Sequence, residues 1–449
     1  MPPIREFEIF CGDCRDILPT LPRLADACIC DPPYGLKFMG KGWDHGVPGV
    51  PYWKAVLNAC KPGAHLLAFG GTRTFHRLTC AIEDAGWEIR DCIMWVYGSG
   101  FPKSRDISKA LDKAAGAERE VVGTKRGVGG ENLNDIVGGR AIRTTDQAGA
   151  RGIGAYGTGA KQVPVDVPIT APATPLAAQW DGWGTALKPA WEPIILARKP
   201  LSGTVAQNVQ AHGCGALNID GCRVEGEGGM RWETPRGGIW TTDSAAKAQL
   251  VPNDKGRWPA NLIHDGSDEV VGLFPQTKSG AMNGVYQNTL MANKAGVRDG
   301  KPIHLQQEAS EGSAARFFYC AKASKQDRDE GCESMPAVKS GMSNGAQLHG
   351  EGYDKGQDIG LNRVIQRRNH HPTVKPTALM RYLVKLVSRP GHTILDPFSG
   401  SGSTGKAAIL EARQFLGIEL QPEYVQIATA RLSHAVKLHQ ESSAQQNLL

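Results

Sequence analysis

The segment HTILDPFSGSGSTGK at residues 392–406, followed by QFLGIE at 414–419, decides the fold class of this chain. An apolar strand ends at Asp396 and runs into a glycine-rich loop, an alanine-rich helix and a second strand that ends at Glu419. Glycines at a strand-helix junction let the backbone approach a ligand, and the free N–H groups of the helix start favour electron-rich atoms. An acid at the tip of the next strand suits a ribose diol. The pattern predicts an α/β fold with a ligand site at this loop.

Two alternatives apply to the same loop. Residues 400–406 fit the GxxxxGK pattern of a nucleotide triphosphatase, but the next residue is Ala407, so the hydroxyl that ligates Mg²⁺ in a P-loop is missing. A purely structural glycine loop is the other alternative, and it leaves Glu419 without a role.

A second motif, Asp31-Pro32-Pro33-Tyr34, follows an apolar run. Two prolines fix φ and remove two backbone donors, so the segment leaves the strand as a stiff corner with free carbonyls. The Asp31 carboxylate and the Pro32 carbonyl could accept both protons of an exocyclic nucleobase amine, while Tyr34 offers a stacking face. An ordinary turn is the alternative, because Asp-Pro is common in turns. The tetrapeptide alone leaves both interpretations open.

Together the motifs resemble those of the DNA amino-methyltransferases, which methylate the exocyclic nitrogen of adenine or cytosine with S-adenosylmethionine (AdoMet). DPPY at 31–34 resembles the catalytic box and FSGSG at 398–402 the cofactor box, in the order typical of the family's β class. NHHPTVKP at 369–376 is similar to that class's other cofactor-contacting segment. The resemblance implies a circularly permuted, Rossmann-like methyltransferase fold with a mostly parallel, doubly wound sheet and large loop-rich insertions.

The resemblance also implies roles for single residues. Asp31 and Pro32, in the corner made with Pro33, would bind the target amine, and Tyr34 would stack on the extruded base. The residues that would surround AdoMet are Asp13, Thr373, Lys375, Asp396, Phe398, Gly400, Ser401, Gly402 and Glu419. In this set Asp13 would contact the adenine and Glu419 the ribose, although a Gly-Asp turn after a strand needs no function.

Amine chemistry constrains the mechanism. The lone pair of an aromatic amine is delocalised, so hydrogen bonds that favour a more tetrahedral nitrogen and alignment with the sulfonium methyl would promote direct displacement. The amine is inaccessible within a stacked duplex, so we expect base flipping. A C5-cytosine methyltransferase would need a cysteine nucleophile, in that family within a Pro-Cys pair, and the chain contains no Pro-Cys dipeptide.

Composition fits a cytoplasmic enzyme, and the resemblance implies double-stranded DNA as its partner. The formal charge of +6 permits nucleic-acid binding without demanding it. The eleven cysteines follow no secretory segment and are expected to be free thiols, and no run of apolar residues is long enough to cross a membrane. The sequence names no partner nuclease and no oligomeric state.

Strand and helix patterns divide the chain into two catalytic pieces and a long middle. Apolar spacing predicts a helix that begins at Pro376, with Leu379, Leu383, Leu386 and Val387 on one face. Glycine, at 55 of 449 residues, is concentrated in the middle and argues for long loops there. The expected segments are a catalytic half (1–97), a glycine-rich insertion (98–186), a core strand (187–200), a target-recognition region (201–365), a cofactor half (366–437) and a polar tail (438–449).

Several features of the middle keep two interpretations each. Residues 317–325 interleave aromatics with cations, which suits DNA contact or a buried strand, and the strand is preferred. Arg363, Arg367 and Arg368 suit phosphate contact or a solvated face. No metal site is expected, because the candidate ligands do not form paired CxxC-type spacings. Those candidates are Cys11, Cys14, His212, Cys214, Cys222, Cys320 and Cys332.

Three functions follow from these motifs. The leading one is a site-specific DNA adenine-N6 methyltransferase, with cytosine-N4 as a close variant, since DPPY leans toward adenine. A catalytically silent DNA-binding protein should have lost Asp31 or the glycine box, and neither is lost. RNA or protein-glutamine methyltransferases share much of the site, but the glutamine-modifying relatives carry Asn in place of this Asp and lack the permuted order.

Overall fold

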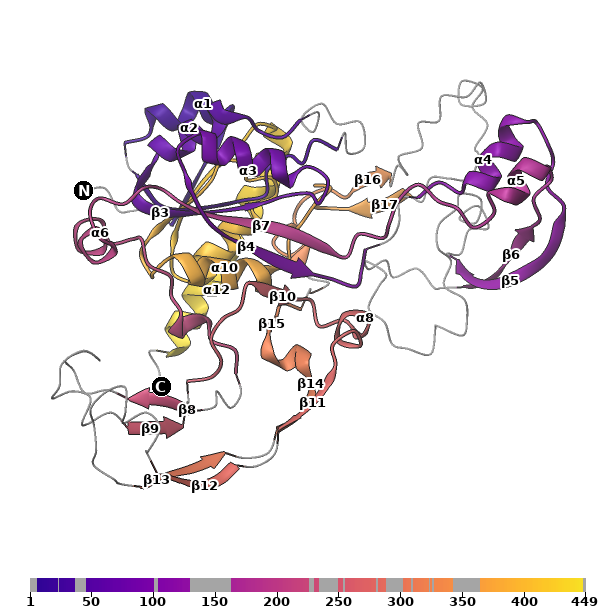
Figure 1. Cartoon of the computed structure of the whole chain (residues 1–449). Coiled ribbons are helices and arrows are strands. Elements are labelled where there is room, and N and C mark those ends of the chain that lie inside the picture. The colour runs from indigo at the N-terminus through magenta and orange to yellow at the C-terminus, as the bar shows by residue number, and fades with distance from the viewer. Residues whose placement is uncertain are drawn as a thin grey trace.

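The computed structural model describes most of both ends of the chain and parts of its middle. The described residues are 6–22, 24–36, 46–100, 104–129, 163–225, 230–233, 249–252, 255–279, 282–287, 302–307, 310–322, 324, 327–341 and 364–446. Figure 1 shows a central sheet with helices on both faces and two groups of elements that project from it.

The described residues form a nine-stranded sheet at the centre of the molecule. In spatial order its strands are β1 (Phe7–Cys11), β19 (Gln414–Glu419), β18 (Thr393–Asp396), β2 (Ala25–Cys30), β3 (Cys60–Phe69), β7 (Trp191–Arg198), β4 (Glu88–Val96), β10 (Leu262–His264) and β15 (Tyr319–Cys320). Every neighbouring pair is parallel except the two that involve β7, which runs antiparallel to β3 and β4. The predicted α/β class with a mostly parallel sheet is confirmed.

The sheet joins the two ends of the chain. Strand β2 of the first piece pairs with β18 of the last piece, through Ile394 opposite Ala27 and Leu395 opposite Cys28. Strand β1 pairs with β19 at the sheet edge. Both motifs recognised in the sequence therefore follow adjacent parallel strands.

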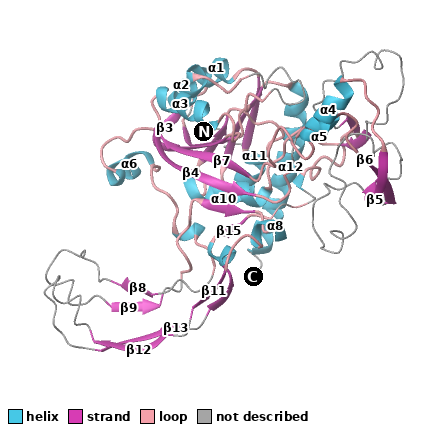
Figure 2. Ribbon diagram, turned by 45° about the vertical axis from the view of Figure 1, so that its right-hand side comes forward, coloured by secondary structure: helices cyan, strands magenta, loops and turns pink. Residues whose placement is uncertain are grey.

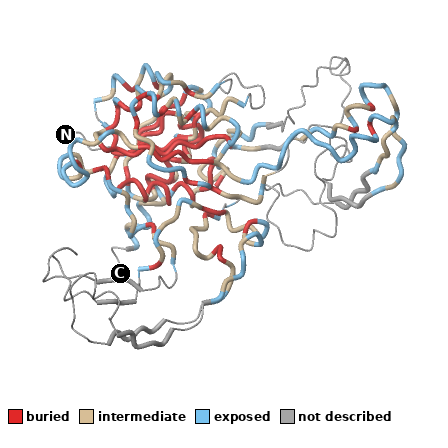
Figure 3. The backbone as a smooth tube through the Cα atoms, in the orientation of Figure 1, coloured by how far each residue is buried: buried red, intermediate tan, exposed pale blue. Residues whose placement is uncertain are grey.

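Helices cover the two faces of the sheet, and the buried side chains concentrate between them (Figure 3). One face packs against α2 (Val50–Asn58) and α3 (Phe75–Asp84), whose Trp53 and Leu78 are buried. The other packs against α10 (Thr377–Val387), α11 (Ser403–Leu410) and α12 (Pro422–Gln446). Each fully buried aliphatic side chain contributes about 1.5–3 kcal/mol, so these two cores hold the sheet together.

The helix predicted at Pro376 is present, with a small shift at its start. All four residues predicted for one face of α10 are buried, and the helix starts one residue after Pro376, which is its N-cap. Helix α3 begins at Phe75 because a turn, closed by the Thr74 N–H on the Gly71 carbonyl, precedes it. Helix α12 continues to Gln446, so most of the expected polar tail at 438–449 is helical.

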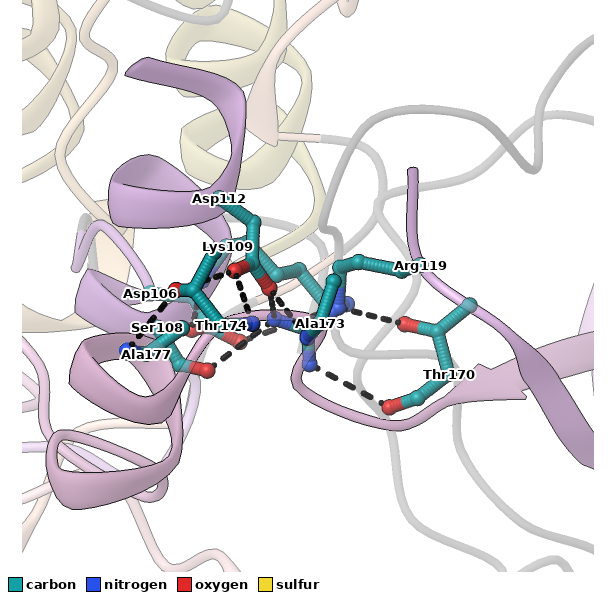
Figure 4. Close-up of polar contacts among 9 residues, drawn as sticks. All are labelled: Asp106, Ser108, Lys109, Asp112, Arg119, Thr170, Ala173, Thr174 and Ala177. Carbon is teal, nitrogen blue, oxygen red and sulfur yellow. Dashed lines mark hydrogen bonds and ion pairs between the residues drawn. The ribbon is translucent and has the colours of Figure 1, made fainter. Parts of the chain in front are cut away.

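The first insertion forms a small group of elements with a polar centre. It contains α4 (Ile107–Ala114), α5 (Pro175–Gln179) and the antiparallel pair β5 (Val121–Gly129) and β6 (Val163–Thr170), which Figure 1 shows apart from the sheet. Figure 4 shows the buried Asp112 carboxylate accepting hydrogen bonds from the backbone N–H of Ala173 (3.0 Å), from Thr174 and from Arg119 Nη1 (2.6 Å). One carboxylate thus links α4 to the end of the ladder where β5 begins and β6 ends.

The second insertion contributes two short strands to the central sheet, and three further antiparallel pairs form an arm that extends from it (Figure 2). The arm's antiparallel pairs are β8 (Met230–Glu233) with β9 (Gln249–Pro252), β11 (Gln276–Ser279) with β14 (Ser310–Ser313) and β12 (Met282–Gln287) with β13 (Pro302–Gln307). Further elements are α1 (Cys14–Ile17), α6 (Val205–His212), α8 (Asp268–Val271) and the pair β16 (Val338–Gly341) with β17 (Val364–Arg367).

Of the residues suspected of DNA contact, Tyr319 and Cys320 form edge strand β15. The ring of Phe317 packs against two guanidinium groups, those of Arg257 and Arg316, at 4.2 and 4.4 Å from the ring centre. Arg367 ends β17, while Arg363 lies outside the described residues. Within the described part of residues 317–325, the preferred strand interpretation holds for Tyr319 and Cys320, which are half-buried rather than buried.

Candidate functional site

A cavity of about 620 Å³ opens where the carboxyl ends of β2, β18 and β19 meet. Parallel strands bring the residues that follow them to one edge of a sheet, so motifs far apart in the sequence meet there. The sequence-predicted residues that line the cavity are Asp13, Asp31, Pro32, Pro33, Tyr34, Thr373, Lys375, Asp396, Phe398, Gly400, Ser401 and Glu419. Gly402 is the exception. It is the N-cap of α11 with φ +76°, and a side chain there would meet Ala428 of α12.

Glu419, at the end of β19, is fixed by the glycine loop. Its Oε2 accepts the N–H of Gly400 at 2.8 Å, and its Oε1 accepts the N–H of Gln421 at 2.9 Å. Burial raises the pKa of this carboxyl, while the backbone hydrogen bonds oppose that rise. A carboxylate has about four lone-pair sites, so these hydrogen bonds do not use all of them. Glu419 can therefore accept hydrogen bonds from a ligand's hydroxyl groups without moving.

Asp396 ends β18 with its carboxyl almost fully buried at the cavity wall. Burial raises its pKa to about 7, against the hydrogen bonds from the Thr404 side chain and the Phe398 N–H. Nearby, the buried Ser399 hydroxyl has no hydrogen-bond partner within the described chain.

Phe398 and Asp13 form further parts of the lining. The Phe398 ring lies 6.2 Å from that of Tyr52 and 5.9 Å from that of the buried Trp53, so aromatic packing holds it in place. Asp13 caps α1 and forms a salt bridge with Arg15 at 2.6 Å. The hydrogen bond from the Arg15 side chain lowers the pKa of Asp13, which keeps it ionised at the cavity rim.

The DPPY motif forms part of a charged cluster deeper in the same cavity. The Tyr34 hydroxyl donates to Asp31 Oδ1 at 2.7 Å, and Thr74 Oγ1 donates to the Tyr34 carbonyl at 2.7 Å. The Lys375 ammonium lies 3.2 Å from Asp31 Oδ2, and it is 5.5 Å from the centre of the Tyr34 ring. The sequence predicted Lys375 as a cofactor-binding residue. The structure places its ammonium beside the predicted amine-binding residues Asp31 and Tyr34.

One member of this cluster was missed by the sequence analysis. Glu192 lies on β7, and its Oε2 is 2.7 Å from Lys375 Nζ and 3.1 Å from the Tyr34 hydroxyl. Strand β7 was expected in the core, but because it runs antiparallel, its first residues reach the carboxyl edge of the other strands. The sequence signal that could have identified Glu192 is an acidic residue at the start of β7, the strand that runs antiparallel to its neighbours.

The segment before α10 closes one side of the cavity. The ring of His371 packs edge-on against Tyr424 of α12 with ring centres 4.5 Å apart, and burial lowers the pKa of His371 to about 4. Arg328 Nη1 donates to the His371 carbonyl at 2.7 Å, so a residue of the second insertion braces this segment. His371 is therefore a neutral wall residue at neutral pH.

No cluster of three or more metal-ligating side chains occurs among the residues that the structure describes. Within the same residues, no helix is both long and apolar enough to cross a membrane. All eleven cysteines are free thiols.

Residues 237–430 match the family model described as DNA methylase. The matched range includes the glycine loop, Glu419 and the segment that carries Lys375, and the DPPY motif lies outside it.

Curated relatives share short stretches with this chain. The DNA adenine methyltransferase YhdJ of Escherichia coli is 42% identical over 72 residues, which cover 16% of this chain and 24% of the relative. The type II methyltransferase M.BglI of Bacillus subtilis is 41% identical over 64 residues, covering 14% and 18%. The chain thus spans about a quarter or less of the length of these relatives.

Solved structures align along most of the chain at low similarity. The M1.HpyAVI–SAM complex is 14% identical, with 95% of this chain and 98% of that chain covered and a TM-score of 0.35. PvuII DNA methyltransferase, described as cytosine-N4-specific, is 12% identical, with 95% and 86% covered and a TM-score of 0.36. TM-scores this low support no further statement about this chain.

Proposed function

We propose that this chain is an AdoMet-dependent DNA methyltransferase that transfers a methyl group to the exocyclic amine of a flipped base, adenine N6. One observation carries the proposal. A single cavity combines the Asp31-to-Tyr34 corner with the glycine loop and Glu419, although these lie at opposite ends of the chain. The match of residues 237–430 to the DNA methylase family supports it.

The cavity wall fits AdoMet. Glu419 offers a carboxylate to ribose hydroxyls, and Asp396 is an acid that a cationic ligand would ionise. Phe398 adds an apolar face. When bound, AdoMet supplies an electrophilic methyl group on a sulfonium. A volume of about 620 Å³ lies within the usual range of ligand pockets, roughly 300–1,000 Å³.

The residues of the chain would prepare the amine for attack. Asp31 Oδ2 and the Pro32 carbonyl accept its two protons, which favours a more tetrahedral nitrogen with an available lone pair. Tyr34 has its hydroxyl tied to Asp31, so its ring is held at the cavity wall for stacking on the base. No covalent enzyme intermediate is needed for direct displacement.

The experiment is methyl transfer from labelled AdoMet to double-stranded DNA, followed by nucleoside analysis of the digested product. The proposal expects label in N6-methyladenine. Label in N4-methylcytosine would support the same methyl transfer with cytosine, rather than adenine, as the target base. Purified, folded protein that binds DNA but transfers no label would contradict the proposal and favour a catalytically silent DNA-binding protein.

A further inference from the structure

Glu192 stands at the point where the reversed strand reaches the cavity. It lies opposite Trp95 of β4 in the register of the sheet, one residue after the start of β7. Its side chain is 20% exposed, lines the cavity and contacts no residue of the glycine loop by hydrogen bond or ion pair. Its environment is the DPPY corner, so its effect should be on the amine side of the reaction rather than on the cofactor.

Glu192 and Asp31 share one cation. Lys375 Nζ is 2.7 Å from Glu192 Oε2 and 3.2 Å from Asp31 Oδ2, and the ammonium is 9% exposed over the ring of Phe69. Tyr34 bridges the two acids, since its hydroxyl is 2.7 Å from Asp31 and 3.1 Å from Glu192. Tyr97 places its hydroxyl 3.5 Å from the other oxygen of Glu192. The shorter ion pair of Lys375 is the one with Glu192.

The sharing matters because Asp31 needs a free lone pair for the amine. A neutral amine competes poorly with an ammonium for a carboxylate, since ionised partners make the stronger hydrogen bonds. With Glu192 in place, Lys375 keeps a carboxylate partner when the amine takes its place at Asp31. Without that partner, Lys375 would be left buried and unpaired whenever Asp31 turned to the amine, which is costly.

We propose that Glu192 is a positioning residue for methyl transfer, which holds Lys375 and Tyr34 so that the Asp31 carboxylate can exchange its cation for the target amine. This inference rests on the proposed function. It gives the reversed strand β7 a role in the reaction and adds a residue to the site from outside the matched family range.

Glu192→Gln is the direct test, measured as single-turnover methyl transfer to DNA at saturating AdoMet. The variant should slow transfer by about tenfold or more, because Lys375 then pairs with Asp31 alone. Binding of labelled AdoMet, measured by equilibrium dialysis, should change by less than about threefold. Glu88→Gln is the matched control, since Glu88 pairs with Arg198 on the same two strands away from the cavity. It should leave the transfer rate unchanged.

The double variant Glu192→Gln with Lys375→Met separates positioning from simple support of the fold. Removing both charges leaves Asp31 as the one carboxylate of the cluster, with the same net charge as the wild-type cluster and no cation to displace. At saturating AdoMet the double variant should transfer faster than Glu192→Gln alone.

Transfer by Glu192→Gln at the wild-type rate, or a double variant slower than Glu192→Gln, would overturn the inference while leaving the proposed function intact. A wild-type protein that transfers no methyl group to DNA would overturn both.

Discussion

Asp396 shows how one buried side chain connects the fold to the proposed chemistry. It ends a central strand with its carboxyl out of contact with bulk solvent, and burial raises its pKa to about 7. The ordinary aspartate value is 3.8. Between those values the folded protein binds a proton that the unfolded chain does not bind, so this group's contribution to stability is present at low pH and is lost as pH rises through about 7.

AdoMet binding should lower the pKa of Asp396, because a cationic ligand favours the ionised carboxylate. The affinity of the wild-type protein for AdoMet is expected to rise with pH below about 7, by up to about tenfold per pH unit, and to level off above it. Titration calorimetry at several pH values measures this slope. In Asp396→Asn the slope should disappear and binding should weaken, so an unchanged slope in that variant would assign the titration to another group.

Single residues also show what the sequence could and could not predict. Asp31, Glu419 and the glycine loop were predictable because each belongs to a local motif that follows a strand. Glu192 was not, because its contact with Lys375 depends on the direction and neighbours of β7, which no local pattern encodes. The same applies to the unpartnered Ser399 hydroxyl, which only the packed loop reveals.

At the scale of elements, the first insertion depends on its own polar centre rather than on the central sheet. Burial opposes ionisation of Asp112, but hydrogen bonds from Ala173, Thr174 and Arg119 outweigh it and lower the pKa. The contribution of this carboxylate to stability is therefore present at neutral pH and lost as pH falls through its lowered pKa.

Asp112→Ala should loosen the insertion while the central sheet stays folded. The change leaves Arg119 and two backbone N–H groups without their acceptor, which favours local opening. Hydrogen exchange should accelerate by about tenfold or more in α4 and α5, and peptides from β2 and β18 should be unaffected. Asp181→Ala, a change of an exposed acid in the same insertion, is the control. Equal exchange in both variants would show that the Asp112 contacts are dispensable.

Two short strands bring the second insertion into the central sheet, and of these only β15 falls in a segment that the sequence predicted as a strand. Strands β10 and β15 have three and two residues, too few to produce a recognisable alternation of apolar and polar residues. Their place beside β4 comes from pairing, with Ile263 opposite Trp95 and Tyr319 opposite Ile263. Tertiary contacts decide such strands, whereas the longer α10 was predictable from its own periodicity.

At the scale of the whole molecule, the two pieces of the chain must join before any site exists. Asp26 on β2 contributes to this join, since its buried carboxylate accepts the Thr393 N–H of β18 at 2.8 Å and pairs with Lys61 at 2.6 Å. The apolar pairing of β2 with β18 supplies most of the contact, and Asp26 satisfies a backbone donor that would otherwise be buried alone.

Asp26→Ala should lower the free energy of unfolding by about 1–3 kcal/mol, the usual cost of a buried donor left without its acceptor. Urea unfolding followed by tryptophan fluorescence measures the change, with Asp181→Ala as the surface control, expected within about 0.5 kcal/mol of wild type. A stability loss no larger than that of the control would mean that water replaces the carboxylate at Thr393.

The central claim is that the Asp31 corner activates an amine on DNA while the distant glycine loop holds AdoMet. Asp31→Ala tests it most directly, with labelled methyl transfer to DNA and AdoMet binding measured on the same preparation. Transfer should fall by about a hundredfold or more. AdoMet affinity should stay within about threefold, since Lys375 keeps its ion pair with Glu192. Transfer at the wild-type rate would contradict the account.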